Sequence, residues 1–109
     1  MRRGDLYTAA ARGTYTGKPL PVAIIQDDRF DATASVTICP LTTNPVEAPL
    51  ARIAVEPSPV NGLEQPSQLM VDKVTTMPRV NLRDHLGRLQ ETELVQLNRA
   101  LIVFLGLAD

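Results

Sequence analysis

The sequence predicts a mainly β domain, a small and strongly bent antiparallel sheet or SH3-like barrel, that ends in one α-helix. Three observations support this fold class. Short apolar runs of strand length recur along the chain between turn residues. The apolar side chains are largely aliphatic, with two Phe, two Tyr and no Trp, and the β-branched ones among them suit strands. Apolar residues at helical spacing occur only in the last part of the chain, 91–105.

The strands of the first half are defined by their flanking residues. Residues 5–10 alternate weakly and predict a first strand, and the two glycines in residues 11–18 predict a loop. The run 21–26 is continuously apolar between proline and two aspartates, which is typical of a strand buried on both faces. A polar loop with one helical turn at 30–33 leads to a β-branched strand at 35–40.

The second half follows the same logic up to residue 89. Proline-containing polar residues at 44–49 predict a loop, and the alternation over 52–56 predicts a half-exposed strand. Turn residues, including an Asn-Gly pair, occupy 57–62. The apolar run 69–74 predicts another strand, and residues 86–89 are short and extended, which gives five or six strands in all.

The final segment is the predicted helix. Glu91 and Glu93 lie in its first turn, where the helix dipole favours acids, and Gly106 follows it as a stop signal. Because residues 100–107 are almost wholly apolar, we expect this end of the helix to be covered by the sheet or by a partner chain.

Length and charge limit the function classes. The 109 residues fit one domain, and a domain this small often gains stability by pairing with a second copy. The net charge of −1 argues against a broadly basic nucleic-acid-binding surface, although Arg52, Lys73, Arg79 and Arg83 could still line a local basic groove. No apolar run reaches the length of a membrane span, so we expect a soluble cytoplasmic protein.

Individual polar residues have plain structural explanations on composition alone. Cys39 is the only cysteine, and we expect no catalytic pair between it and the sole histidine, His85. Asp27 and Asp28 at a strand end are typical of a solvated turn. Asp72 lies within a predicted strand, where alternation towards solvent and a functional site explain it equally well.

Several short segments, in their order and spacing, resemble the MazF/PemK family of toxin endoribonucleases. They are RGDLY at 3–7, PVAIIQDD at 21–28, CPLTT at 39–43, Gly-Leu at 62–63, SQLMVDKVTT at 67–76 and Gly-Arg-Leu at 87–89 before the last helix. The resemblance implies an SH3-like barrel that forms a homodimer and cuts single-stranded RNA without a metal or cofactor. It also implies attack of a ribose 2′-OH on the neighbouring phosphorus, which gives a 2′,3′-cyclic phosphate and a 5′-OH end.

The same resemblance assigns roles to residues of this chain. Thr42 matches the catalytic threonine of the family, and Leu20 occupies the position of its catalytic arginine. Leu20 can neither donate a hydrogen bond nor carry charge, so we expect the endoribonuclease activity of this chain to be weakened or absent. The expected substrate-binding residues are Lys18, Gln26, Asp27, Thr43, Asp72, Lys73, Thr75 and Arg79.

The resemblance also implies a partner and two alternatives. The partner is an antitoxin of the MazE/PemI type, whose disordered tail would lie in the RNA groove. A CcdB-like gyrase inhibitor shares the fold but uses a Trp-containing C-terminal motif, whereas this chain has no Trp. A degenerate homologue that only binds antitoxin is the other alternative. Leu20 has two possible origins. Either a natural homologue lost or changed its activity, or the catalytic arginine was replaced deliberately because an active toxin kills the cell that produces it.

Overall fold

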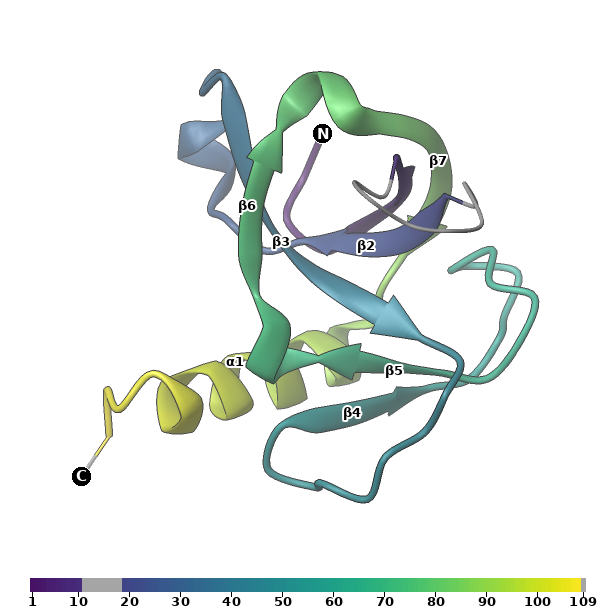
Figure 1. The fold of residues 1–109 in the computed structure, drawn as a ribbon, viewed down its shortest axis with the longest axis vertical. Coiled ribbons are helices and arrows are strands. Elements are labelled where there is room, and N and C mark those ends of the chain that lie inside the picture. Colours follow the sequence, from purple (N-terminus) through teal and green to yellow (C-terminus); the bar gives the residue numbers. More distant parts are fainter. Residues whose placement is uncertain (11–18, 109) are drawn as a thin grey trace.

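The computed structural model describes residues 1–10 and 19–108, which form seven strands, three 3-10 turns and one α-helix (Figure 1). In chain order the elements are β1 (Asp5–Ala9), β2 (Leu20–Ile24), η1 (Asp28–Phe30), β3 (Ser35–Thr42), β4 (Arg52–Val55), β5 (Ser67–Met70), η2 (Val71–Lys73), β6 (Thr75–Pro78), η3 (Arg79–Asn81), β7 (Leu82–Arg88) and α1 (Glu91–Phe104). The predicted fold class, mainly β with a C-terminal helix, is confirmed.

All strand pairs are antiparallel, and the longest strand, β3, organises them. Its first half pairs with β6, its middle with β2, and its last two residues pair with β5. The order is β4-β5-β3-β2-β1-β7, with β6 beside β3. Since β4 and β7 are the two ends of this order among the described strands, the sheet bends strongly but does not close into a complete barrel.

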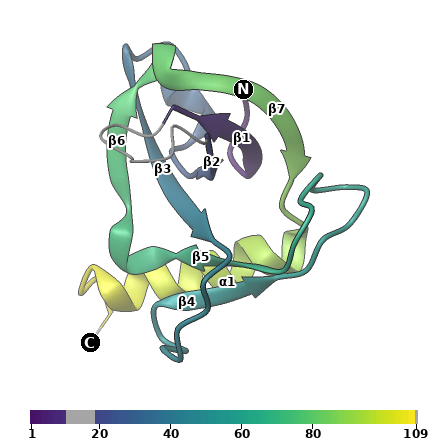
Figure 2. The same ribbon diagram turned by 45° about the vertical axis from the view of Figure 1, so that its right-hand side comes forward.

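The bent sheet encloses two separate cores. In Figure 2, β6 and β7 form an arc around β1 and β2, while α1 lies below, beside β4 and β5. The core inside the arc is formed by Ala9, Val22, Ile24, Val36 and Ile38. The larger core lies between the sheet and α1, and its members include Leu6, Leu41, Leu69 and Leu97. Alternating residues of β3 therefore supply both cores.

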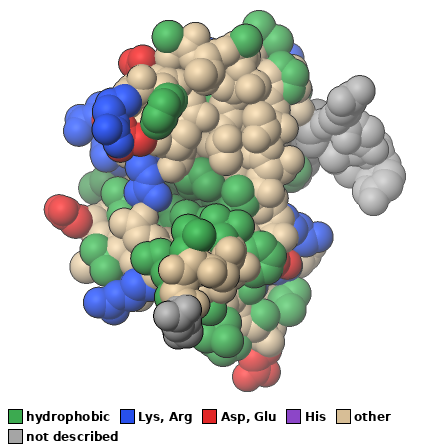
Figure 3. All heavy atoms as spheres, turned by 90° about the vertical axis from the view of Figure 1, so that its left-hand side faces the viewer, with side chains coloured by type: hydrophobic (Ala, Val, Ile, Leu, Met, Phe, Trp, Pro, Cys, Tyr) green, Lys and Arg blue, Asp and Glu red, His purple; other side chains and the backbone are tan. Residues whose placement is uncertain are grey.

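The helix has the termini that the sequence predicts. The Gln90 side chain and the Glu93 side chain form a reciprocal capping box at its N-terminus. Gly106 has a φ of 71°, and the backbone N–H of Gly106 donates to the Val103 carbonyl as the helix ends. The following residues are exposed and apolar, and Figure 3 shows hydrophobic side chains gathered around this end of the chain.

Three strand predictions differ from the structure. The strand predicted at 69–74 ends at Met70, because the chain turns at η2 while Val71 still points into the core. β6 was not predicted, since TTMP shows no apolar alternation and is held by pairing with a distant strand. The extended segment predicted at 86–89 begins earlier, at Leu82. Because β6 is added, the structure has seven strands rather than five or six.

No helix within residues 1–10 and 19–108 is long and apolar enough to cross a membrane.

Candidate functional site

Leu20 and Thr42 lie at the same edge of the molecule. β2 begins at Leu20 and β3 ends at Thr42. The pairing of the two antiparallel strands ends at Val22 and Pro40, so Leu20 and Thr42 each lie two residues beyond the last pair, on the same side of it. Leu20 is 41% exposed, so this edge is open to a large ligand.

The Thr42 hydroxyl is held by the loop that follows it. Its oxygen accepts a hydrogen bond from the backbone N–H of Asn44 at 3.1 Å. That bond uses a lone pair of the hydroxyl and leaves its proton free to donate to another oxygen. Thr43, the next residue, is exposed at the start of the loop 43–51.

Gln68 fixes the same loop, and sequence reasoning missed it. It pairs with Thr42 across β3 and β5. Its side-chain amide accepts from the backbone N–H of Val46 at 3.0 Å and donates to the Val46 carbonyl at 3.1 Å. The pairing of β3 with β5 is not visible in the sequence, because nothing local links two strands separated by a long loop.

Leu20 itself carries no charge. Lys18, which the resemblance offers as a substrate-binding residue, lies outside the described residues, as does the rest of 11–18.

Gln26 and Arg79 lie at the opposite end of β2 and β3. The Gln26 amide donates to the Phe30 carbonyl at 2.7 Å and accepts from the backbone N–H of Thr37 at 2.9 Å. The Arg79 guanidinium donates to the Thr33 carbonyl at 2.8 Å. These two candidate RNA-binding side chains are thus engaged in holding the loop between β2 and β3.

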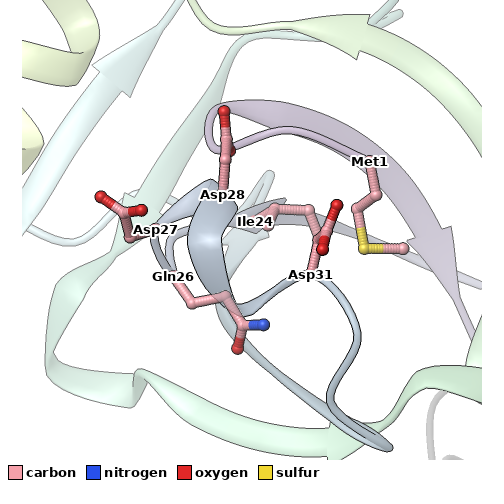
Figure 4. Close-up of a pocket in the computed structure, with 6 residues that line it drawn as sticks. All are labelled: Met1, Ile24, Gln26, Asp27, Asp28 and Asp31. Atoms are coloured by element: carbon pink, nitrogen blue, oxygen red, sulfur yellow. The ribbon is translucent and has the colours of Figure 1, made fainter.

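Asp27 belongs to the same loop and borders a shallow hollow (Figure 4). Its carboxylate accepts from the backbone N–H of Arg29 at 2.9 Å and from the Arg29 side chain at 3.0 Å. The backbone bond, and then the side-chain bond, hold the pKa of Asp27 below its usual value. The neighbouring Asp28 carboxylate accepts from the backbone N–H of Arg3. The solvated turn predicted for Asp27 and Asp28 is therefore confirmed.

Three more candidates lie where β5 passes into β6. Asp72 and Lys73 are exposed on η2, and Thr75 begins β6 opposite Ile38. The Arg52 guanidinium donates to both carboxylate oxygens of Asp72, at 2.9 and 3.3 Å. These hydrogen bonds lower the pKa of Asp72. The prediction that Asp72 lies within a strand is wrong. Asp72 lies in the turn η2, where its carboxylate accepts hydrogen bonds from Arg52.

Cys39 and His85 do not form a pair. Cys39 lies in β3 and His85 in β7, with β2 and β1 between them. The thiol is buried, and burial raises its pKa to about 12, so it is not a nucleophile. The His85 ring instead contacts Tyr7 edge-on, with ring centroids 5.1 Å apart.

Within residues 1–10 and 19–108, no three His, Cys, Asp or Glu side chains are arranged to hold a metal ion. The side chains of Thr42 and Gln68 place a hydroxyl and an amide near the end of β3.

Comparisons with known sequences cover nearly the whole chain. The model of a family described as PemK-like, MazF-like toxin of type II toxin–antitoxin system matches residues 2–105. A curated relative from Mycolicibacterium smegmatis, named probable endoribonuclease MazF, is 66% identical over 108 residues, which are 99% of each chain. The curated endoribonuclease MazF of Staphylococcus saprophyticus is 28% identical and covers 98% of this chain and 92% of its own.

Solved structures agree in fold. An endoribonuclease from a mycobacterial species, in complex with its cognate antitoxin, superposes with a TM-score of 0.82 at 28% identity, over 100% of this chain and 98% of that chain. The Mycobacterium tuberculosis toxin MazF-mt6 superposes with a TM-score of 0.81 at 25% identity, over 96% of this chain and 99% of that chain.

Proposed function

Because the chain belongs to the PemK-like, MazF-like family of type II toxin–antitoxin toxins, we propose that it is an endoribonuclease that binds single-stranded RNA across the edge formed by Leu20 and Thr42. One observation supports the proposed site most directly. It is that both positions lie two residues beyond the last pair of β2 and β3, on the same side of it, and that Leu20 is exposed. A cation and a hydroxyl at those positions could both reach one phosphate.

The proposed reaction uses the ribose 2′-OH as nucleophile. The 2′-OH gives up its proton to a base as its oxygen attacks the adjacent phosphorus, the bond to the 5′ oxygen of the next nucleotide breaks, and that 5′ oxygen takes up one proton. The products are a 2′,3′-cyclic phosphate and a 5′-OH end, and DNA is not a substrate because it lacks the nucleophile. The Thr42 hydroxyl donates to a phosphoryl oxygen as negative charge develops there.

Leu20 limits this chemistry. An arginine at this position would offer a planar set of donors to the phosphoryl oxygens, whereas leucine offers none. Loss of one preorganised donor costs on the order of 100–1,000-fold in rate. We infer that the chain as it stands has the architecture of the toxin and only weak activity. Arg79 does not replace the arginine, because it lies at the other end of β3 and is bonded to Thr33.

An antitoxin is the proposed partner. One of the solved mycobacterial endoribonucleases is bound to its cognate antitoxin. A MazE-MazF structure from Deinococcus radiodurans has the same fold. A disordered antitoxin tail that orders in the RNA groove would block the edge near Thr42 directly. We place this function in the cytoplasm, where mRNA is available.

A homodimer completes the proposal. The exposed apolar residues at the end of α1 leave a large hydrophobic surface uncovered (Figure 3). They are Ile102, Val103, Phe104, Leu105 and Leu107. An isologous contact between two copies would bury this surface. Light scattering at micromolar concentration would give the mass of a dimer, and a monomer mass would contradict this part of the proposal.

The experiment that tests the activity compares the chain with Leu20→Arg on a long single-stranded RNA in EDTA. We expect the arginine variant to cut on the order of 100-fold faster or more and to leave cyclic-phosphate ends. If both forms cut equally fast, another residue supplies the charge and the role given to position 20 is wrong. If neither cuts any RNA, the endoribonuclease function is contradicted and a protein that only binds antitoxin is favoured.

A further inference from the structure

Gln68 lies beside Thr42 on the outer face of the sheet. The two residues are partners in the antiparallel pairing of β3 with β5, and directly opposed residues project their side chains from the same face. The neighbouring pair, Leu41 and Leu69, is buried in the larger core. Since side chains alternate along a strand, Thr42 and Gln68 point away from that core. The Gln68 amide and the Thr42 hydroxyl therefore belong to one surface.

The Gln68 amide bonds both backbone groups of one loop residue. It accepts from the Val46 N–H at 3.0 Å and donates to the Val46 carbonyl at 3.1 Å. A strand neighbour holds its partner in the same way in an antiparallel hydrogen-bonded pair. The two bonds fix the orientation of the Val46 backbone as well as its position, which a single bond would leave free to rotate.

Pro45 passes this constraint to Asn44. The proline ring fixes its own φ, and it restricts the preceding residue, Asn44, to extended backbone. Once Val46 is held, few backbone rotations are left by which Asn44 could move. The backbone N–H of Asn44 is the group that donates to the Thr42 hydroxyl oxygen at 3.1 Å. Gln68 is thus connected to that hydroxyl through a short and stiff segment, 44–46.

The bond from Asn44 sets the orientation of the Thr42 hydroxyl. Threonine has more than one accessible χ1 rotamer, and the bond favours the rotamer that turns the oxygen towards Asn44. The same bond occupies a lone pair of that oxygen, so the hydroxyl proton points away from the loop. A donor held in this way needs no reorientation when charge develops on a phosphoryl oxygen.

We propose that Gln68 is a positioning residue for RNA cleavage, and that it acts on the Thr42 hydroxyl through residues 44–46. The inference rests on the proposed endoribonuclease function and adds a residue to its machinery. The Gln68 amide is bonded to Val46 on both its oxygen and its nitrogen, so it acts without bonding the substrate. Its loss therefore slows the chemical step and leaves RNA binding nearly unchanged.

The first test is kinetic and uses the Leu20→Arg form on single-stranded RNA. Gln68→Met keeps the length of the side chain and removes both bonds, and we expect kcat to fall about tenfold while KM changes by less than about twofold. Gln68→Asn carries the same amide on a stem too short to reach Val46, and it should be as slow. An unchanged kcat, or a change confined to KM, would overturn the inference.

Gln65→Leu is the matched control. Gln65 lies just before β5, and its side chain is exposed. This variant should keep the kcat of the Leu20→Arg form. An equal loss of kcat in Gln65→Leu and Gln68→Met would overturn the inference, because the loss would not depend on the bonds to Val46.

Combination with Thr42→Val shows whether Gln68 acts through the hydroxyl. In that background no hydroxyl remains at position 42 to be oriented, so Gln68→Met should change the residual kcat by less than about twofold. A general structural role would give the same tenfold loss with and without the hydroxyl. That additive result would overturn the inference.

The orientation of the Thr42 side chain is measured by NMR on the chain with Leu20. Three-bond couplings to the Thr42 Cγ2 carbon should show one χ1 rotamer in the parent and averaging in Gln68→Met. Pro45→Ala leaves Gln68 in place but loosens the segment between it and Asn44, so it should also show averaging. Retention of a single rotamer in both variants would overturn the inference.

The two measurements separate failure of the proposed function from failure of this inference. If the Leu20→Arg form cuts no RNA, the endoribonuclease function is contradicted, whereas the couplings still decide whether Gln68 orients the Thr42 hydroxyl. If that form cuts RNA and Gln68→Met cuts it equally fast, only the role of Gln68 is overturned.

Discussion

The Arg52 guanidinium donates two hydrogen bonds, of 2.9 and 3.3 Å, to the Asp72 carboxylate, and these bonds join strand β4 to the turn η2. The Arg52 side chain is 9% exposed and that of Asp72 is 32% exposed, so the pair lies at the boundary of the core. The acidic residue that the sequence offers for substrate binding therefore has a structural partner, and its charge is neutralised by that partner.

Breaking this pair should destabilise the fold. We expect Arg52→Met and Asp72→Asn each to lower the free energy of unfolding. The double variant should lose less than the sum of the two, with a coupling energy of about 1 kcal/mol. Urea unfolding of the four proteins in the cycle measures the coupling. Additive losses would show that the two bonds contribute nothing to stability.

The contribution of Asp72 to the free energy of unfolding should be lost at low pH. Its pKa is lowered in the folded state, chiefly by the hydrogen bonds from Arg52. The stabilisation is therefore complete above the unfolded value of about 3.9 and is lost as pH falls through the lower folded value. The melting temperature of the parent should exceed that of Asp72→Asn by a constant amount from pH 7 to pH 5. The two curves should converge below pH 4, and a gap that persists at pH 2 would contradict this.

Removal of the Thr42 hydroxyl should slow catalysis strongly without unfolding the protein. In the Leu20→Arg background, Thr42→Val keeps the shape of the side chain but loses the donor, and we expect a fall in cleavage rate of about 100-fold. Thr42→Ser keeps the hydroxyl and should retain most of the rate. Equal activity of the valine and serine variants would remove Thr42 from the reaction, provided that both melt within a few degrees of the parent.

Gly87 should tolerate no side chain. A Cβ atom at this position would lie 2.2 Å from the Val60 carbonyl oxygen, because the turn 57–62 packs directly on β7. Gly87→Ala should cost at least about 2 kcal/mol of unfolding free energy.

Gly106→Ala is the matched control. It meets nothing within 4 Å and carries only the strain of a φ of 71°, so it should cost about 1 kcal/mol. If Gly87→Ala proves no more destabilising than Gly106→Ala, the turn can move away from β7.

The sequence predicted the elements whose signals are local. The helix is confirmed because its apolar spacing, its capping residues and its stop at Gly106 all lie within one stretch. β6 escaped prediction because its stability comes from pairing with β3, some 40 residues away in the chain. The turn at Asp72 could not be predicted from the apolar pattern. Val71 is as buried as a strand residue would be, so the apolar run continues through the point where the chain changes direction.

The candidate site was predicted only in part, for a similar reason. The motifs mark both Leu20 and Thr42, and the strand order and register put both beyond the same end of the β2–β3 pairing. Gln26 and Thr42 both lie near strand ends in the sequence, yet they lie at opposite ends of the sheet because the strands are antiparallel. The Gln68 clamp could not be foreseen, since only the β3–β5 pairing brings its amide to Val46.

The larger core also sets when this chain can fold. It joins Leu6, near one end of the chain, to Leu97, near the other, and the Arg3 guanidinium reaches Asn98 at 2.7 Å. A nascent chain on the ribosome cannot close this core until residue 97 has emerged. The edge that carries Thr42 is therefore not supported by a closed core until that point, and the interval gives a partner already present in the cell time to meet the chain as it folds.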